Sequence, residues 1–204
     1  MKEEESSESD PAQDKFKVKE LSEKTIAKID GVSFQKNDKV ELNDLRMVKV
    51  QHYGFDDNVH TGELIVHKKV AQEVRDIFKE LLKAEFPIEK IRLIDEYDAD
   101  DDLSMQDNNS SALNVRYITG SDGVFSKHSY GIAIDINPVQ NPYVRGDTVL
   151  PPEGEKYTDR SLDKKGMIHT GDACYNAFKN RGWTWGGNWN SLQDYMHFEK
   201  DIDL

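Results

Sequence analysis

Hydrophobic residues recur at helical spacing in one long stretch of the chain and alternate with polar residues in several short ones. Over residues 68–84 they return every three or four positions, which predicts an amphipathic helix whose apolar face comprises Val70, Val74, Ile77, Phe78, Leu81 and Leu82. A shorter helix is expected over residues 21–29, with Ser22 as its N-cap. Another is expected near residues 170–181, ending at Gly182.

Alternation of apolar and polar residues, or short apolar runs, predicts strands over residues 46–53, 62–67, 90–97, 113–118, 132–137 and 195–199. In residues 132–137 three isoleucines would face one side and Asp135 the other. Residues 98–111 and 138–166 are expected to be loops. Because helices and strands do not alternate regularly, we predict a single α+β domain in which helices flank an antiparallel sheet.

The chain of 204 residues has a formal net charge of −12, concentrated in two segments. Residues 1–14 contain six acidic residues and one lysine, and residues 98–107 contain five acidic residues and no basic one. This balance argues against a nucleic-acid partner and against docking on anionic membranes. No apolar run approaches the roughly 20 residues of a membrane span. Residues 1–15 have the composition of a disordered linker, so the folded domain is expected over residues 16–204.

Two histidines stand near carboxylates at spacings that suit a metal site. His128 precedes Asp135 by seven residues, and Asp194 precedes His197 by three. A turn through Gly131 would return the His128 ring to the polar side of its strand, where His197 could complete the three ligands of a catalytic zinc. Asp194 would then act as a general base. Spacing alone leaves a second interpretation open, with an exposed His128, a His197 at the core edge and a capping Asp135.

These residues also resemble a known family. The segment Ser126-x-His128-x-x-Gly131-x-Ala133-x-Asp135 matches the S-x-H-x-x-G-x-A-x-D signature of the D-alanyl-D-alanine carboxypeptidases, the VanY-like metallopeptidases. A Trp-rich segment that begins at Trp185 and ends in Asp194-x-x-His197 matches their second signature. The similarity runs in order over about residues 20–200. Related enzymes are the L-alanyl-D-glutamate endopeptidases.

The resemblance implies one zinc ion per chain, held by His128, Asp135 and His197. It implies that Asp194 is the catalytic acid or base, at a position where many relatives carry the longer Glu. Arg116 corresponds to an arginine that faces the substrate, where a guanidinium could bind an oxyanion or a carboxylate. The structural alternative for Arg116 is an ion pair with the acidic loop.

Three further residues are expected to contact the substrate: Ser126, Trp185 and Asp107. Each has a structural alternative, namely a turn hydroxyl that satisfies the backbone, a packed core tryptophan and a solvated loop carboxylate. The alternating aspartates of the acidic loop do not make an EF-hand, because Leu103 and Asn109 stand where that loop needs Gly and Glu.

From the resemblance we predict a zinc-dependent peptidase that hydrolyses peptidoglycan stem peptides, with D-alanyl-D-alanine carboxypeptidase activity as the first expectation. The alternatives are an L-alanyl-D-glutamate-type endopeptidase and a non-catalytic zinc-bearing binding module, since hedgehog proteins share this site architecture. A module without chemistry would not need Asp194. The substrate implies a location in the cell envelope, the periplasm or outside the cell, so we expect an export signal to have been removed.

Overall fold

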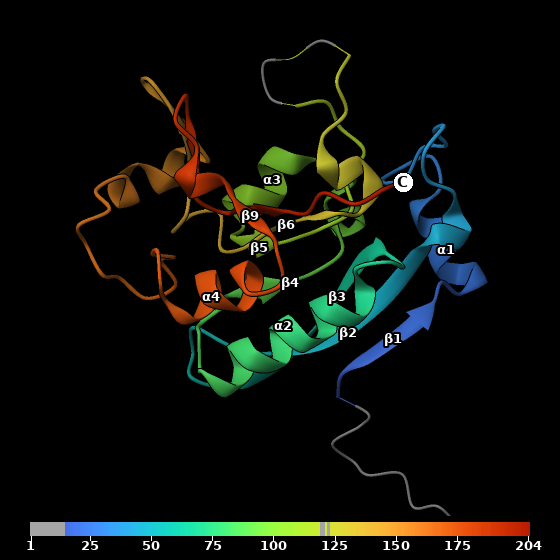
Figure 1. Ribbon diagram of the computed structural model, residues 1–204, viewed down its shortest axis with the longest axis horizontal. Helices are drawn as coiled ribbons and strands as arrows, with labels where there is room; N and C mark the ends of the chain where they lie inside the picture. The colour runs from blue at the N-terminus through green and yellow to red at the C-terminus, as the bar shows by residue number, and fades with distance from the viewer. Residues whose placement is uncertain (1–14, 119–120, 122) are drawn as a thin grey trace, which may run out of the picture.

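The N-terminal part of the fold is built on a long β-hairpin. Strands β2 (Leu45–Tyr53) and β3 (Val59–His67) pair antiparallel over their whole length, and β1 (Lys17–Glu20) adds to the other edge of β2. This computed structural model describes residues 15–118, 121 and 123–204. The predicted linker over residues 1–15 therefore lies almost wholly outside the described residues. Figure 1 shows the three strands side by side, with the long helix α2 (Ala71–Lys83) lying against them.

The helices form where the apolar spacing and the capping residues predict them. In α1 (Glu23–Ile29) the Ser22 side chain accepts a hydrogen bond from the Thr25 backbone N–H, and in α4 (Ala173–Lys179) Asp172 caps Tyr175 in the same way. Helix α2 buries Val74, Ile77, Phe78 and Leu81 on one face. These predictions are confirmed to within a few residues at each end. An ion pair of 2.6 Å between Arg181 Nη2 and Glu80 Oε1 joins the end of α4 to α2.

A second sheet carries short strands in the order β6–β11–β9, with antiparallel pairing throughout. Its strands are β6 (Ala133–Asp135), β11 (His197–Glu199) and β9 (Thr184–Trp185). Ile132, Ile134 and Ile136 lie in the main core with Phe78 and Phe198, as the alternation predicts. One face of this sheet therefore belongs to the same core as the hairpin and α2, and the other face is free to carry polar side chains.

The remaining strands are short. A third antiparallel sheet has the order β10 (Gln193–Asp194), β7 (Tyr143–Arg145), β8 (Thr148–Leu150). Strands β4 (Lys90–Ile91) and β5 (Asn109–Ser110) form a parallel pair. Five 3-10 helices complete the described part of the chain: η1 (Leu42–Asp44), η2 (Ile94–Tyr97), η3 (Lys127–Tyr130), η4 (Pro152–Tyr157) and η5 (Gly186–Asn188). The prediction of mixed helix and antiparallel sheet is thus confirmed.

Four local predictions are wrong. The strand expected over 90–97 ends after Ile91 and continues as η2, and residues 113–118 join no sheet, although Tyr117 bridges to Phe125. The acidic segment contains a helix, α3 (Asp101–Gln106). Asp100 caps that helix by accepting from the Leu103 N–H, and the acidic residues of its first turn favour the positive end of the helix dipole. Residues 138–166 are not only loop, because they include β7, β8 and η4.

No helix in the described part of the chain is long and apolar enough to span a membrane.

Candidate metal centre

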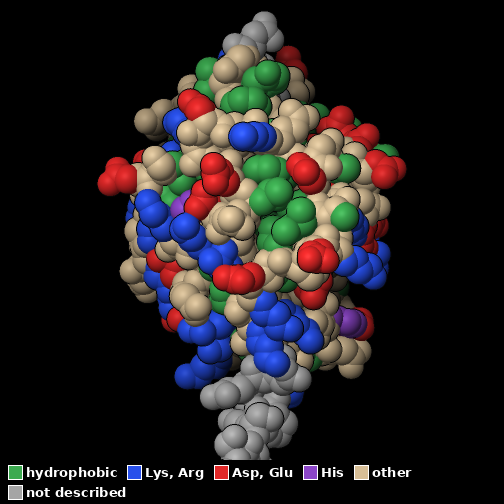
Figure 2. Space-filling model, turned by 90° about the vertical axis from the view of Figure 1, so that its right-hand side faces the viewer, with side chains coloured by type: hydrophobic (Ala, Val, Ile, Leu, Met, Phe, Trp, Pro, Cys, Tyr) green, Lys and Arg blue, Asp and Glu red, His purple; other side chains and the backbone are tan. Residues whose placement is uncertain are grey.

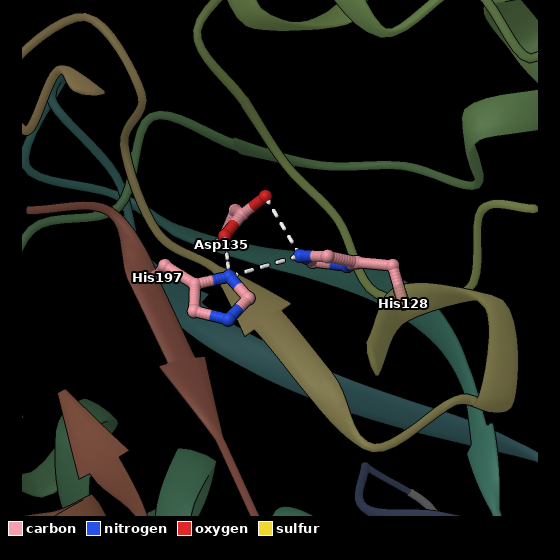
Figure 3. A group of neighbouring side chains, drawn as sticks. All are labelled: His128, Asp135 and His197. Carbon is pink, nitrogen blue, oxygen red and sulfur yellow. Dashed lines mark hydrogen bonds and ion pairs between the residues drawn. The ribbon is translucent and has the colours of Figure 1, made fainter. Parts of the chain in front are cut away.

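Three side chains from separate elements meet at the polar face of the second sheet (Figure 3). His128 comes from η3, Asp135 from the end of β6 and His197 from the start of β11, where it is the register partner of Asp135. Gly131 joins η3 to β6 with φ +66°, and a Cβ atom there would lie 2.8 Å from the His67 backbone N. Only glycine fits this turn, which returns the His128 ring to the side of Asp135.

The polar atoms of these three residues face one point. Asp135 Oδ2 lies 3.0 Å from His128 Nε2, and Asp135 Oδ1 lies 3.0 Å from His197 Nδ1. The two ring nitrogens are 3.1 Å apart. All three side chains are buried. Tetrahedral zinc with bonds of about 2.0–2.1 Å separates its ligand atoms by about 3.4 Å, so the observed spacing is close to that of a zinc site.

The outer hydrogen bonds of the two histidines show which nitrogens are available. His128 Nδ1 donates to the Ala112 carbonyl oxygen at 2.5 Å, and His197 Nε2 lies 3.1 Å from Glu199 Oε2, a carboxylate that can only accept. The neutral rings therefore direct the lone pairs of His128 Nε2 and His197 Nδ1 at each other. Two facing lone pairs need a proton or a cation between them. This donor set, two imidazoles and one carboxylate with outer partners, fits zinc.

Electrostatics support the same conclusion. Burial opposes the charge on Asp135, but the two histidines beside it outweigh this and hold the pKa of Asp135 well below its usual range. Burial also disfavours a charged His197, yet its hydrogen bonds to Asp135 and Glu199 raise the pKa of His197 to about 10. The site therefore attracts positive charge, and a bound cation would take the place of a proton on His197.

Asp194 lies close enough to this cluster to interact with the charges of His197 and Asp135. It belongs to β10, and its buried Oδ1 atom has no hydrogen-bond partner among the described residues. Burial is the main cause that raises the pKa of Asp194 to about 7, and the charge of His197 opposes that shift. Gly186 passes so close that a Cβ atom there would lie 2.6 Å from the Asp194 carbonyl oxygen. A carboxyl group that titrates near neutral pH is suited to both accepting and returning a proton.

Residues 119–200 match the family model of the D-alanyl-D-alanine carboxypeptidases. The matched segment includes His128, Asp135, Asp194 and His197, so the resemblance inferred from the sequence is confirmed over residues 119–200. The earlier part of the predicted similarity, over about residues 20–118, lies outside the match. The match supports, in general terms, a peptidoglycan-related zinc peptidase, and thus a metallopeptidase hydrolase. No solved structure matches the chain.

A cavity of about 710 Å³ adjoins the polar cluster of His128, Asp135 and His197. Arg116, Asp194, His197 and Glu199 line it together with a set of apolar side chains that includes Ile118, Val124, Phe125, Tyr130, Trp189 and Leu192. Figure 2 views the side on which the C-terminal end of the chain lies in Figure 1, and it shows apolar side chains gathered between acidic and basic ones. The C-terminal residues Ile202 and Leu204 also line the cavity. Charged groups and apolar walls thus share one space, as in many ligand sites.

Arg116 lies just before the segment that matches the carboxypeptidase model, and the structure places it at the cluster. Its Nη2 atom is 3.5 Å from Asp135 Oδ2, and its Nε atom is 3.2 Å from Asp101 Oδ2. Burial alone would lower the pKa of Arg116, but the charges of Asp101, Asp135 and Asp194 outweigh burial and raise it. Arg116 therefore pairs with the acidic segment, as the structural alternative predicts, and it also lines the cavity.

The three expected substrate contacts fare differently. Ser126 lines the cavity, and its Oγ also accepts from the His128 backbone N–H at 3.3 Å. Trp185 is buried and donates from Nε1 to the Tyr195 carbonyl oxygen, and Asp107 pairs with Lys90 at 2.6 Å. Neither Trp185 nor Asp107 is among the residues that line the cavity. Trp185 points into the core because β9 pairs with β11, and Trp189 lines the cavity instead.

Glu199 lies at the candidate metal centre, and the sequence pattern alone assigned it no role. Its signal was present, since it follows His197 by two positions on a predicted strand and therefore shares its face. Only the ring orientation of His197 shows that the two side chains bond to each other.

Proposed function

We propose that this chain is a zinc-dependent peptidase that removes a terminal D-alanine from peptidoglycan stem peptides. The observation that carries the proposal is the set of two buried imidazoles and one carboxylate facing a single point, beside an unpartnered Asp194 and a wide cavity. His128, Asp135 and His197 would hold one zinc ion per chain. Such a substrate implies work at the cell envelope, in the periplasm or outside the cell.

The side chains of the site divide the reaction between them. Bound zinc would supply Lewis-acid activation of the scissile carbonyl and of water. Asp194 accepts the proton of the attacking water at its free Oδ1 and returns it to the leaving amine, so that the peptide C–N bond breaks while a C–O bond forms. Arg116, held by Asp101 and Asp135, donates hydrogen bonds to the developing oxyanion or to the terminal carboxylate of the substrate.

One observation supports a second activity, cleavage of an internal L-alanyl-D-glutamate-type bond. The apolar side chains that line the cavity with the polar groups include Ile118, Val124, Tyr143 and Leu192. A space of about 710 Å³ has room for peptide on both sides of a scissile bond. A non-catalytic zinc module is less well supported, because the buried and unpartnered Oδ1 atom of Asp194 costs stability and would serve no purpose in such a module.

Mass spectrometry of defined stem pentapeptides incubated with the zinc-loaded protein tests the proposal. We expect loss of one terminal alanine, whereas two internal fragments would instead identify the endopeptidase. A chelated sample and Asp194→Asn serve as controls. The Asn side chain cannot accept the water proton, so turnover is expected to fall by about 10²–10⁴-fold while zinc remains bound. Near-normal turnover by Asp194→Asn would refute its assignment.

A further inference from the structure

We propose that Glu199 is a positioning residue that fixes the tautomer and orientation of His197, so that Nδ1 of this ring faces the metal. The inference rests on the proposed zinc site. It starts from the distance of 3.1 Å between His197 Nε2 and Glu199 Oε2. Since a carboxylate only accepts, the hydrogen bond keeps the ring proton on Nε2 and leaves the Nδ1 lone pair for a ligand bond.

The backbone holds Glu199 rigidly in this position. β11 is the central strand of its sheet, and Glu199 has register partners on both sides, Ala133 in β6 and Thr184 in β9. Next to it, the Lys200 N–H donates to the Ile132 carbonyl oxygen at 3.0 Å. A side chain on a central strand can therefore orient its i−2 neighbour with little backbone adjustment.

The two histidines are oriented in different ways. His128 donates to a backbone carbonyl, that of Ala112, which no side-chain substitution removes. His197 depends on a side chain, and its ring is buried, with 7% of the side chain exposed. Without Glu199, the ring could turn over or carry its proton on Nδ1, where it would block the metal. Outer partners of this kind are typically worth 10–100-fold in metal affinity.

One basic residue, Lys127, and one further carboxylate, Asp201, lie close enough to Glu199 to interact with its charge. Lys127 Nζ forms an ion pair with Asp201 Oδ1. Asp201 is thus a carboxylate close to Glu199 that touches neither ligand histidine, and it provides a matched control. Removing it changes the local charge by the same amount but leaves the hydrogen bond to His197 in place.

The test is zinc affinity, measured at one fixed pH by competition with a fluorescent chelator, for Glu199→Ala, Glu199→Gln and Asp201→Ala. We expect a 10–100-fold loss for Glu199→Ala, a smaller loss for Glu199→Gln because its amide oxygen can still accept, and no more than about twofold for Asp201→Ala. Equal losses in Glu199→Ala and Asp201→Ala would overturn the inference, because they would show an effect of charge alone. Wild-type affinity in Glu199→Ala would overturn it too.

A second measurement uses the wild-type protein, so it does not depend on whether a variant folds. Nitrogen-15 NMR of the imidazoles in the zinc-loaded wild-type protein should show His197 protonated at Nε2 and metal-bound through Nδ1. The opposite assignment would overturn the inference. If the wild-type protein binds no zinc, the proposed function fails. If it binds zinc and Glu199→Ala binds it equally well, only the role of Glu199 fails.

Discussion

The β2–β3 hairpin and the β6–β11–β9 sheet are both antiparallel, but they are stabilised in opposite ways. The hairpin strands are nine residues long, and Val48, Leu64 and Val66 on them are fully or almost fully buried. The strands of the second sheet are two or three residues long and carry Asp135 and His197 in the interior. Burying aliphatic side chains stabilises a fold, whereas burying charged groups costs free energy unless they are paired.

The difference shows how such short strands hold a site in place. Ile134 and Phe198 on the reverse of the second sheet lie in the same core as Val48 and Phe78. Apolar burial in the hairpin and α2 thus supplies most of the folding free energy. This offsets the cost of holding charged groups close together in the second sheet. If this division is correct, substitutions in the hairpin or α2 should mainly lower the free energy of unfolding. Substitutions at the polar face of the second sheet should mainly reduce zinc binding or turnover.

The largest effect is expected from His128→Ala. It removes one of three ligands from a site with no described substitute, so the purified protein should lose its stoichiometric zinc. Elemental analysis of zinc per chain measures this, and denaturant unfolding of the zinc-free protein provides the comparison. One zinc per chain in His128→Ala would exclude this residue as a ligand.

Phe78→Ala should produce the largest effect in the other region. Phe78 is fully buried in the main core, so its truncation is expected to lower the free energy of unfolding by about 3–5 kcal/mol. Zinc per chain, measured well below the unfolding temperature, should stay unchanged. A stability loss below about 1 kcal/mol, or zinc loss from a folded variant, would contradict the division between the regions.

A pair of crowded glycines provides a sharper comparison. A Cβ atom at Gly186 would lie 2.6 Å from the Asp194 carbonyl oxygen, and one at Gly62 would lie 2.4 Å from Ile91 Cβ. Gly186→Ala should displace Asp194 and reduce kcat by about a hundredfold. Gly62→Ala is expected to lower the unfolding temperature instead, with kcat of the folded fraction preserved. If both variants lose only stability, the placement of Asp194 by Gly186 is wrong.

The smallest effect concerns pH. With the pKa of His197 raised to about 10 in the zinc-free protein, the ring is protonated between pH 6 and 8, and zinc must displace one proton. Zinc affinity should therefore rise about tenfold per pH unit in this range. The raised pKa stabilises the zinc-free fold fully below the unfolded pKa of about 6.5, and this stability is lost as the pH rises toward 10. A pH-independent affinity in chelator-buffered zinc would contradict this.

The sequence predicted the parts of the fold that carry a long or strict pattern. The apolar face of α2, the hairpin strand β2 and the alternation around Asp135 were all readable, because many residues repeat one signal. The three candidate ligands were readable from a spacing that matched a family signature, and the structure brings them together.

Other features depended on contacts that no local pattern records. Helix α3 is only six residues long and is stabilised by the Asp100 cap, so its acidic sequence resembled a loop. Trp185 and Trp189 lie four residues apart in one Trp-rich segment, and only the pairing of β9 with β11 decides which of them enters the core. The bond between Glu199 and His197 likewise required the ring orientation.

The alternation along β11 sets a limit on engineering. Phe198 stacks on Phe178 with ring centroids 4.0 Å apart, and its two strand neighbours His197 and Glu199 face the opposite side of the sheet. A larger or smaller side chain at position 198 would shift the backbone of both. Attempts to raise the melting temperature by redesigning this core should therefore keep residues 197–199 unchanged and use positions on the β2–β3 hairpin and α2, where stability can be gained without altering the chemistry.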